Sequence, residues 1–130
     1  MDPNGHVRHS VYYDLGASIR VAFLSAHGLT FEVLEALHFG PILFREEAVF
    51  RREIRYGDDL WINLLVSKAR RDGSRFSFRH EITRADGTRC AVINVDGAWI
   101  DTHLRKLAAP PEMVREMFEA GPKSADFEWI

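Results

Sequence analysis

The chain has 130 residues, a length that suits a single hydrophobic core, so we expect residues 1–130 to form one domain. Its formal net charge is -2 with the two signs interspersed, so we expect neither a nucleic-acid partner nor a membrane partner. The single cysteine, Cys90, cannot form an intrachain disulfide, and the sequence has no long apolar run, which indicates a soluble, cytoplasmic protein.

The spacing of apolar residues predicts a long helix over residues 10–28. One helical face would carry Tyr12, Leu15, Ile19, Ala22, Phe23 and Ala26. Ser10 suits the N-cap and Gly28 suits the residue that follows the helix. A short second helix over residues 31–37 would be capped by Thr30 and ended by Gly40-Pro41.

Residues 42–101 have the alternating pattern of four successive strands. The expected strands cover residues 42–56, 60–69, 74–84 and 88–101. The third alternates most strictly between apolar and polar residues, and Asp86-Gly87 after it is typical of a tight hairpin turn. Gly97 inside the last strand predicts a bulge or a close backbone approach.

After the strands, Pro110-Pro111 would open a C-terminal helix over residues 111–120. The tail from Lys123 to Ile130 contains Phe127 and Trp129, which need a surface to pack on. Helices followed by a run of strands predict an α+β fold. We expect an antiparallel sheet wrapped around one long central helix.

Residues 1–9 place one carboxylate, Asp2, and two histidines, His6 and His9, directly ahead of the long helix. Backbone N–H groups at a helix start are unpaired and the dipole is positive there, which suits chemistry on a carbonyl group. Asp2, His6 and His9 could also suggest a metal site, but no further ligand stands at a suitable spacing, so we expect no metal. The sequence also lacks a nucleophile elbow and a glycine-rich phosphate loop.

An ordered set of motifs resembles the hotdog-fold acyl-CoA thioesterases of the 4-hydroxybenzoyl-CoA thioesterase type. The run from Asp2 to Val7, with His9 and Tyr12, is similar to that family's Asp-x-x-Gly-His-Val-Asn-Asn-x-x-Tyr. Further matches, in order, are Arg20, Tyr56-Gly57-Asp58, Gly73-Ser74 with Phe78, and Ala85-Asp86-Gly87. The chain departs from the family at Ala17, where members often carry a carboxylate, and at the leading strand that usually precedes the Asp.

The resemblance implies a five-stranded sheet around the helix, and homodimers that join sheets edge to edge, often paired again into homotetramers. We expect the seam to run through the long last strand or its neighbour, with active sites shared across it. We also expect that extending the chain upstream of Met1 raises stability and activity together.

The activity implied is hydrolysis of an acyl-CoA or acyl carrier protein thioester, with Asp2 as nucleophile or general base. His9 would hold the carbonyl or the water. The substrate would also meet Gly5, His6, Val7, Tyr12, Arg70 and Arg75, the two arginines binding coenzyme A phosphates. No cofactor is expected beyond the coenzyme A of the substrate. The rival hypothesis is a non-catalytic module that binds an acyl thioester or only dimerises.

Overall fold

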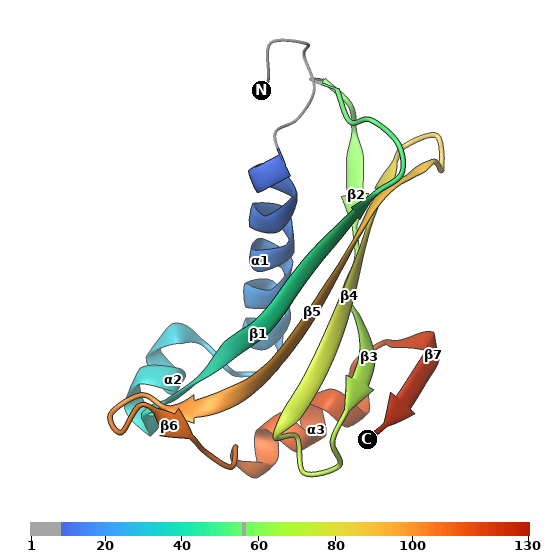
Figure 1. Ribbon diagram of the computed structural model, residues 1–130. Helices are drawn as coiled ribbons and strands as arrows, with labels where there is room; N and C mark the ends of the chain where they lie inside the picture. Colours follow the sequence, from blue (N-terminus) through green and yellow to red (C-terminus); the bar gives the residue numbers. More distant parts are fainter. Residues whose placement is uncertain (1–8, 56) are drawn as a thin grey trace.

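The computed structural model describes residues 9–55 and 57–130, with side chains from Val11 onward (Figure 1). Three helices occur in this part: α1 (His9–Ala26), α2 (Phe31–Leu37) and α3 (Glu112–Ala120). Its strands are β1 (Phe39–Phe50), β2 (Leu60–Ile62), β3 (Leu65–Ala69), β4 (Arg75–Arg84), β5 (Arg89–Asp101), β6 (Lys106–Leu107) and β7 (Lys123–Trp129).

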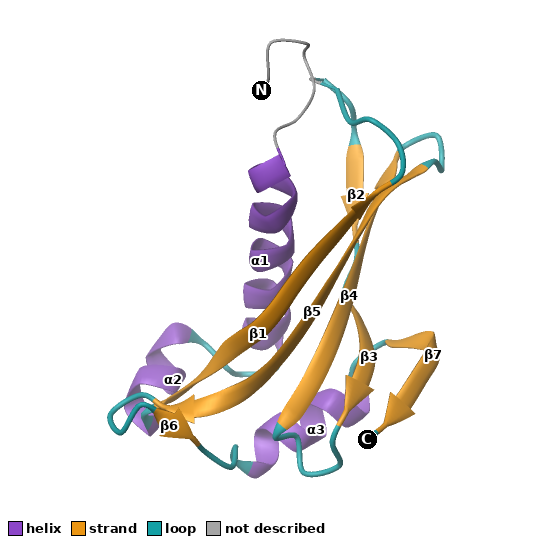
Figure 2. Cartoon of the chain, in the orientation of Figure 1, coloured by secondary structure: helices purple, strands orange, loops and turns teal. Residues whose placement is uncertain are grey.

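The strands form one sheet in the order β1-β5-β4-β3-β7, with β2 also paired to β4 and β6 to β5 (Figure 2). All pairs are antiparallel except β3 with β7, which is parallel. The α+β class is confirmed, but the expectation of a purely antiparallel sheet was wrong at this edge. The long last predicted strand, β5, lies between β1 and β4, so it cannot serve as a free edge.

Two helices share one face of the sheet. The ring of Phe78 on β4 lies 5.7 Å from the ring of Phe23 on α1 and 5.9 Å from the ring of Phe118 on α3, measured between centroids. Phe118 also stacks on Phe76 at 5.3 Å. The helical layer is therefore built by α1 and α3 together, where the sequence predicted one central helix alone.

The inward face of α1 differs in part from the predicted stripe. Tyr12 is buried, and Leu15, Ile19 and Phe23 pack against the core as expected. Ala22 and Ala26 are exposed, and the buried positions that the stripe omitted are Gly16 and Leu24. Alanine satisfies the apolar pattern in either orientation, because its burial contributes little free energy.

β1 begins at Phe39, three residues earlier than predicted, and runs through Pro41. Proline is tolerated there because β1 is the outer strand and its other side has no described partner. Opposite Gly97 the β1–β5 register shifts between Leu43 and Arg45. A Cβ on Gly97 would lie 2.5 Å from the carbonyl oxygen of Ile42, so the predicted close backbone approach is confirmed.

The predicted strand 60–69 is interrupted at Asn63, which separates β2 from β3. The Asn63 side chain replaces the regular pairing: its Oδ1 accepts from the backbone N–H of Glu81 at 2.7 Å. Its Nδ2 donates to the Glu81 carboxylate at 2.8 Å. This side-chain bonding frees the Asn63 carbonyl oxygen, which points to His80.

The C-terminal tail, which the sequence left without a defined element, forms β7 beside β3. Trp129 lies under the Arg71 guanidinium at 4.8 Å and packs edge-on against Phe127, with ring centroids 5.0 Å apart. β7 is the fifth long strand of the sheet, after the four that the sequence predicted. The C-terminal helix was predicted closely, since α3 ends at Ala120 as expected.

Candidate functional site

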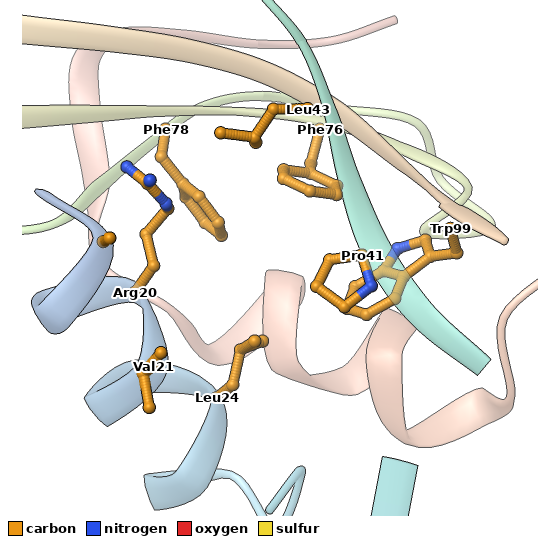
Figure 3. A pocket seen from close by; sticks show the side chains of 9 residues that line it. Arg20, Val21, Leu24, Pro41, Leu43, Phe76, Phe78 and Trp99 are labelled. Atoms are coloured by element: carbon orange, nitrogen blue, oxygen red, sulfur yellow. The ribbon is translucent and has the colours of Figure 1, made fainter. Parts of the chain in front are cut away.

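A pocket of about 230 Å³ lies between α1 and the sheet (Figure 3). Its described lining comprises Ala17, Arg20, Val21 and Leu24 from α1, Pro41 and Leu43 from β1, Phe76 and Phe78 from β4, and Trp99 from β5. These walls converge because α1 crosses the sheet diagonally (Figure 1). Val21 and Leu43, which are 63% and 39% exposed, place the opening in the space between α1 and β1.

Arg20 is the single charged side chain among the nine described residues that line this pocket. The other polar side-chain group in the lining, the Trp99 indole N–H, already donates to the carbonyl oxygen of Gly73 at 2.9 Å. An occupant of the pocket therefore meets aromatic and aliphatic walls and one guanidinium. This is the common composition of a small-molecule site, in which a few polar groups set the orientation of the ligand.

The Arg20 guanidinium is held by His80 of β4, whose side chain is fully buried. His80 Nδ1 lies 3.1 Å from the Asn63 carbonyl oxygen, and since a carbonyl only accepts, Nδ1 carries the proton. Nε2 then accepts from Arg20 Nη1 at 2.9 Å. Burial, with the neighbouring Arg20 charge, lowers the pKa of His80 to about 4, so the imidazole is neutral at pH 7.

Two further residues complete this network. Glu46 of β1 accepts from Arg20 Nη2 at 3.2 Å, so the guanidinium links α1 to both β1 and β4. Gly16 faces the same point: a Cβ there would lie 3.1 Å from Arg20 Nη1 and 3.2 Å from His80 Cδ2. A glycine inside a helix costs about 1 kcal/mol relative to alanine, and here its missing side chain leaves room for the Arg20–His80 contact.

The predicted catalytic turn lies mostly outside the described residues. Asp2, Gly5, His6 and Val7 fall there, and so does the side chain of His9, although His9 opens α1. Ala17, the first pocket residue on α1, stands eight positions after His9, or about 12 Å along the helix axis. The first pocket residue thus lies about two turns along α1 from the start of the helix.

Tyr12, expected to bind substrate, is buried in the core and 4% exposed. Its ring packs edge-on against Phe50 with centroids 4.8 Å apart. Burial is the main cause that raises the pKa of its hydroxyl. Tyr12 does not appear in the described lining of the pocket, and its role in binding stays a prediction.

Arg70 and Arg75, expected to meet coenzyme A phosphates, do come together. They line an open hollow with Ser74 beside the β3–β4 turn, and Trp99 borders both this hollow and the apolar pocket. The Arg75 guanidinium lies over the Phe44 ring at 4.7 Å. In Figure 1 this turn and the start of α1 lie at opposite ends of the molecule.

Arg20 and His80 were not predicted as a pair from the sequence. For Arg20 the sequence showed only a match to a family motif, and for His80 it predicted only an inward position on a strand. One available signal was a charged residue on the inward face of a helix, one turn after a glycine. Among the described residues, no cluster of three or more His, Cys, Asp or Glu side chains could hold a metal ion.

Comparisons with solved structures support the fold. A protein from Staphylococcus aureus in complex with CoA gives a TM-score of 0.87, at 22% identity over 96% of this chain and 80% of that chain. A 1,4-dihydroxy-2-naphthoyl-CoA thioesterase from Synechocystis gives a TM-score of 0.81, at 21% identity over 92% of this chain and 88% of that chain. A gentisyl-coenzyme A thioesterase gives a TM-score of 0.78, at 19% identity over 91% of this chain and 90% of that chain.

Curated protein sequences gave no match. No helix in the described part of the chain is long and apolar enough to span a membrane. The sequence profile of the thioesterase-like superfamily matches residues 1–118, which include the Asp2–Val7 turn, α1 and every described residue of the pocket. The chain belongs to the thioesterase-like superfamily.

Proposed function

We propose that this chain is a thioesterase that hydrolyses an acyl-CoA, or an acyl carrier protein thioester, to the free acid and the thiol. The observation that carries the proposal is the family match over residues 1–118, since that stretch contains both a carboxylate ahead of a helix and an apolar pocket beside that helix. The structural similarity to a protein in complex with CoA and to two CoA thioesterases supports it.

In this proposal Asp2 is the nucleophile or the general base. As a base it takes a proton from water, the hydroxide adds to the thioester carbonyl, and the carbon–sulfur bond breaks to release the thiolate. Backbone N–H groups at the start of α1 stabilise the negative charge that develops on the carbonyl oxygen. His9, in the first turn of α1, positions the carbonyl or the water. The reaction needs no cofactor.

Substrate recognition divides between two regions. The apolar pocket takes part of the acyl group, and its walls of Phe76, Phe78 and Trp99 favour an aromatic group of the 4-hydroxybenzoyl kind. Arg70 and Arg75 take coenzyme A phosphates. Because the β3–β4 turn and the start of α1 lie at opposite ends of one chain, a substrate that contacts both sets is best served by two copies, with each site shared across a dimer.

The test measures the turnover of a panel of aromatic and straight-chain acyl-CoA thioesters, with the release of the free thiol as the readout. Asp2→Asn keeps the shape and removes the charge, so kcat should fall about a hundredfold or more while substrate still binds. His9→Ala should cost about tenfold to a hundredfold, as expected for a positioning group. Turnover by Asp2→Asn equal to that of the parent protein would favour the rival, a non-catalytic acyl-thioester-binding module.

A further inference from the structure

We propose that the pocket between α1 and the sheet selects a compact acyl group that carries a neutral hydrogen-bond acceptor, and that Arg20 is the specificity-determining residue. The identification of the ligand as an acyl group rests on the function proposed above. The preference for an acceptor rests on the pocket itself, and it can be tested without any turnover.

The pocket offers a donor and no accepting side chain. Of the five N–H groups of the Arg20 guanidinium, two are occupied by His80 and Glu46 among the described residues. The remaining eight lining residues are apolar or, for Trp99, already bonded to Gly73. A ligand oxygen beside Arg20 would gain a charge-assisted hydrogen bond, whereas a ligand donor would find no partner.

The charges around Arg20 favour a neutral acceptor over a carboxylate. Glu46 already compensates the guanidinium at 3.2 Å, and His80 is neutral. A carboxylate placed in this pocket would add a second negative charge against apolar walls, which is costly because nothing else there compensates it. A ketone or ether oxygen needs only the hydrogen bond, because it accepts and brings no donor of its own.

The size of the pocket limits the rest of the group. Its volume of about 230 Å³ falls below the range of roughly 300–1,000 Å³ typical of pockets for drug-sized ligands. Phe76, Phe78 and Trp99 present ring surfaces to the cavity (Figure 3). A single ring or a short branched group fits these walls, with its acceptor turned toward α1.

His80 acts as the positioning residue of this arrangement. Its Nδ1–H is committed to the Asn63 carbonyl, so Nε2 always presents a lone pair to Arg20. The guanidinium is therefore fixed before a ligand arrives, and less conformational freedom is lost on binding. Gly16 keeps the space for this contact open.

The direct test uses two neutral probes with the same carbon skeleton, acetophenone and ethylbenzene, in which a carbonyl group of the first stands where the second has a methylene group. NMR titration would follow the Trp99 indole signals for the parent protein and for Arg20→Met. We expect the affinity ratio of acetophenone to ethylbenzene to fall about tenfold or more in Arg20→Met, because a hydrogen bond to a charged donor is lost. Arg45→Met, on the opposite face of the sheet, is the matched control and should keep the parent ratio.

A second pair of variants addresses His80 and guards against a folding defect at Arg20. His80→Gln keeps an acceptor for Arg20 and should largely keep the ratio, whereas His80→Leu removes it and should lower the ratio toward that of Arg20→Met. Equal ratios in the parent protein, Arg20→Met and His80→Leu would overturn the inference. So would binding of both probes without any change in the Trp99 signals.

The inference and the proposed function can fail separately. Should the parent protein hydrolyse no thioester while the probe ratio still depends on Arg20, the proposed function fails and the pocket preference stands. Should it hydrolyse keto-substituted and unsubstituted acyl-CoA thioesters with relative kcat/KM values that Arg20→Met leaves unchanged, the inference fails and the thioesterase assignment stands.

Discussion

Asp126 of β7 accepts hydrogen bonds from both terminal nitrogens of Arg79 of β4, at 3.0 Å each. β3 lies between these two strands, so the ion pair reaches across it on the polar face of the sheet. Ser124 donates to the same carboxylate at 2.7 Å. Because β7 shares only a short and irregular parallel register with β3, this pair is one of the contacts that hold the edge strand, beside the packing of Phe127 and Trp129 against the core.

We expect the attachment of β7 to weaken in acid. Hydrogen bonds from Arg79 and Ser124 hold the pKa of Asp126 well below its usual value. A carboxylate with a depressed folded pKa stabilises the fold above its unfolded pKa, about 3.9, and this contribution is lost as pH falls through the folded pKa. NMR signals of Trp129 should therefore shift toward exposed values as pH is lowered from about 5 to 2.

Asp126→Asn should show the detached Trp129 signals already at neutral pH and should lose most of the acid dependence. Glu128→Gln is the matched control on the same strand, because the Glu128 carboxylate makes only a looser contact, 3.8 Å from Lys68 Nζ. The same acid transition in Asp126→Asn as in the parent protein would show that the Arg79–Asp126 pair does not tether β7.

The case of β7 shows where prediction from the sequence stopped. Strand Arg75–Arg84 was predictable because its strict alternation spans ten residues and ends in Asp86-Gly87. Lys123–Trp129 also alternates, but over seven residues at the end of the chain, where the same pattern fits an unpaired tail. Its parallel pairing to β3 was not predictable, because alternation is identical in both strand directions.

His80 should make the protein less stable as pH falls through the mildly acidic range. Its folded pKa of about 4 lies below the unfolded value of 6.5, so the unfolded chain binds the extra proton between these values. Stability therefore rises with pH across this window, by up to about 3 kcal/mol for such a shift. Urea unfolding between about pH 7 and pH 4.5 measures this slope.

His80→Gln removes the titrating group while keeping hydrogen-bonding capacity, so its free energy of unfolding should depend less on pH than that of the parent protein. Parallel pH curves for His80→Gln and the parent protein would contradict the buried neutral state of His80.

The Arg20–His80 contact also explains why the site was only partly predictable. The two residues are sixty positions apart, and their meeting depends on the angle at which α1 crosses β4. Period-two alternation correctly assigned His80 to the inward face, but it cannot distinguish a packed imidazole from one that holds a guanidinium. The interruption at Asn63, which orients His80, arises from side-chain bonds to Glu81 that no local pattern encodes.

Gly97→Ala should destabilise the sheet and distort the pocket. An added Cβ would lie 2.5 Å from the Ile42 carbonyl oxygen and 2.6 Å from Phe76 Cζ, and the first of these is backbone that cannot move aside cheaply. We expect a loss of about 2 kcal/mol or more in the free energy of unfolding, as for other overpacked sites. Gly40→Ala is the control on the partner strand, since its Cβ would meet Thr102 Cγ2 at an ordinary 3.6 Å. Equal unfolding free energies for the two variants would contradict this packing argument.

The last prediction concerns self-association through β1. Among the described strands β1 pairs only with β5, so the outer side of residues 39–49 has no strand beside it there. Phe44 and Val49 on this strand are 51% and 38% exposed. The strand is long, and its charges, Pro41 and bulge are concentrated in its first nine residues, which leaves the end around Val49 without them. Two copies that pair through β1 would continue the sheet and cover these side chains. They would also bring a second chain to Pro41 and Leu43, on the wall of the pocket.

We therefore expect the parent protein to sediment as a dimer, or as a tetramer of two such dimers, at micromolar concentration. Val49→Lys places a charge at the joined edge and should shift the equilibrium toward the monomer, because the charge would have to be buried between copies. Leu104→Lys is the matched control: Leu104 is 67% exposed in the loop between β5 and β6, at the other end of β1 from Val49, so the sedimenting mass of this variant should equal that of the parent protein. If the parent protein were monomeric, or if Val49→Lys kept the parent mass, β1 would not be the seam, and the Arg70–Arg75 hollow of one copy could not be assigned to the helix start of another through this edge.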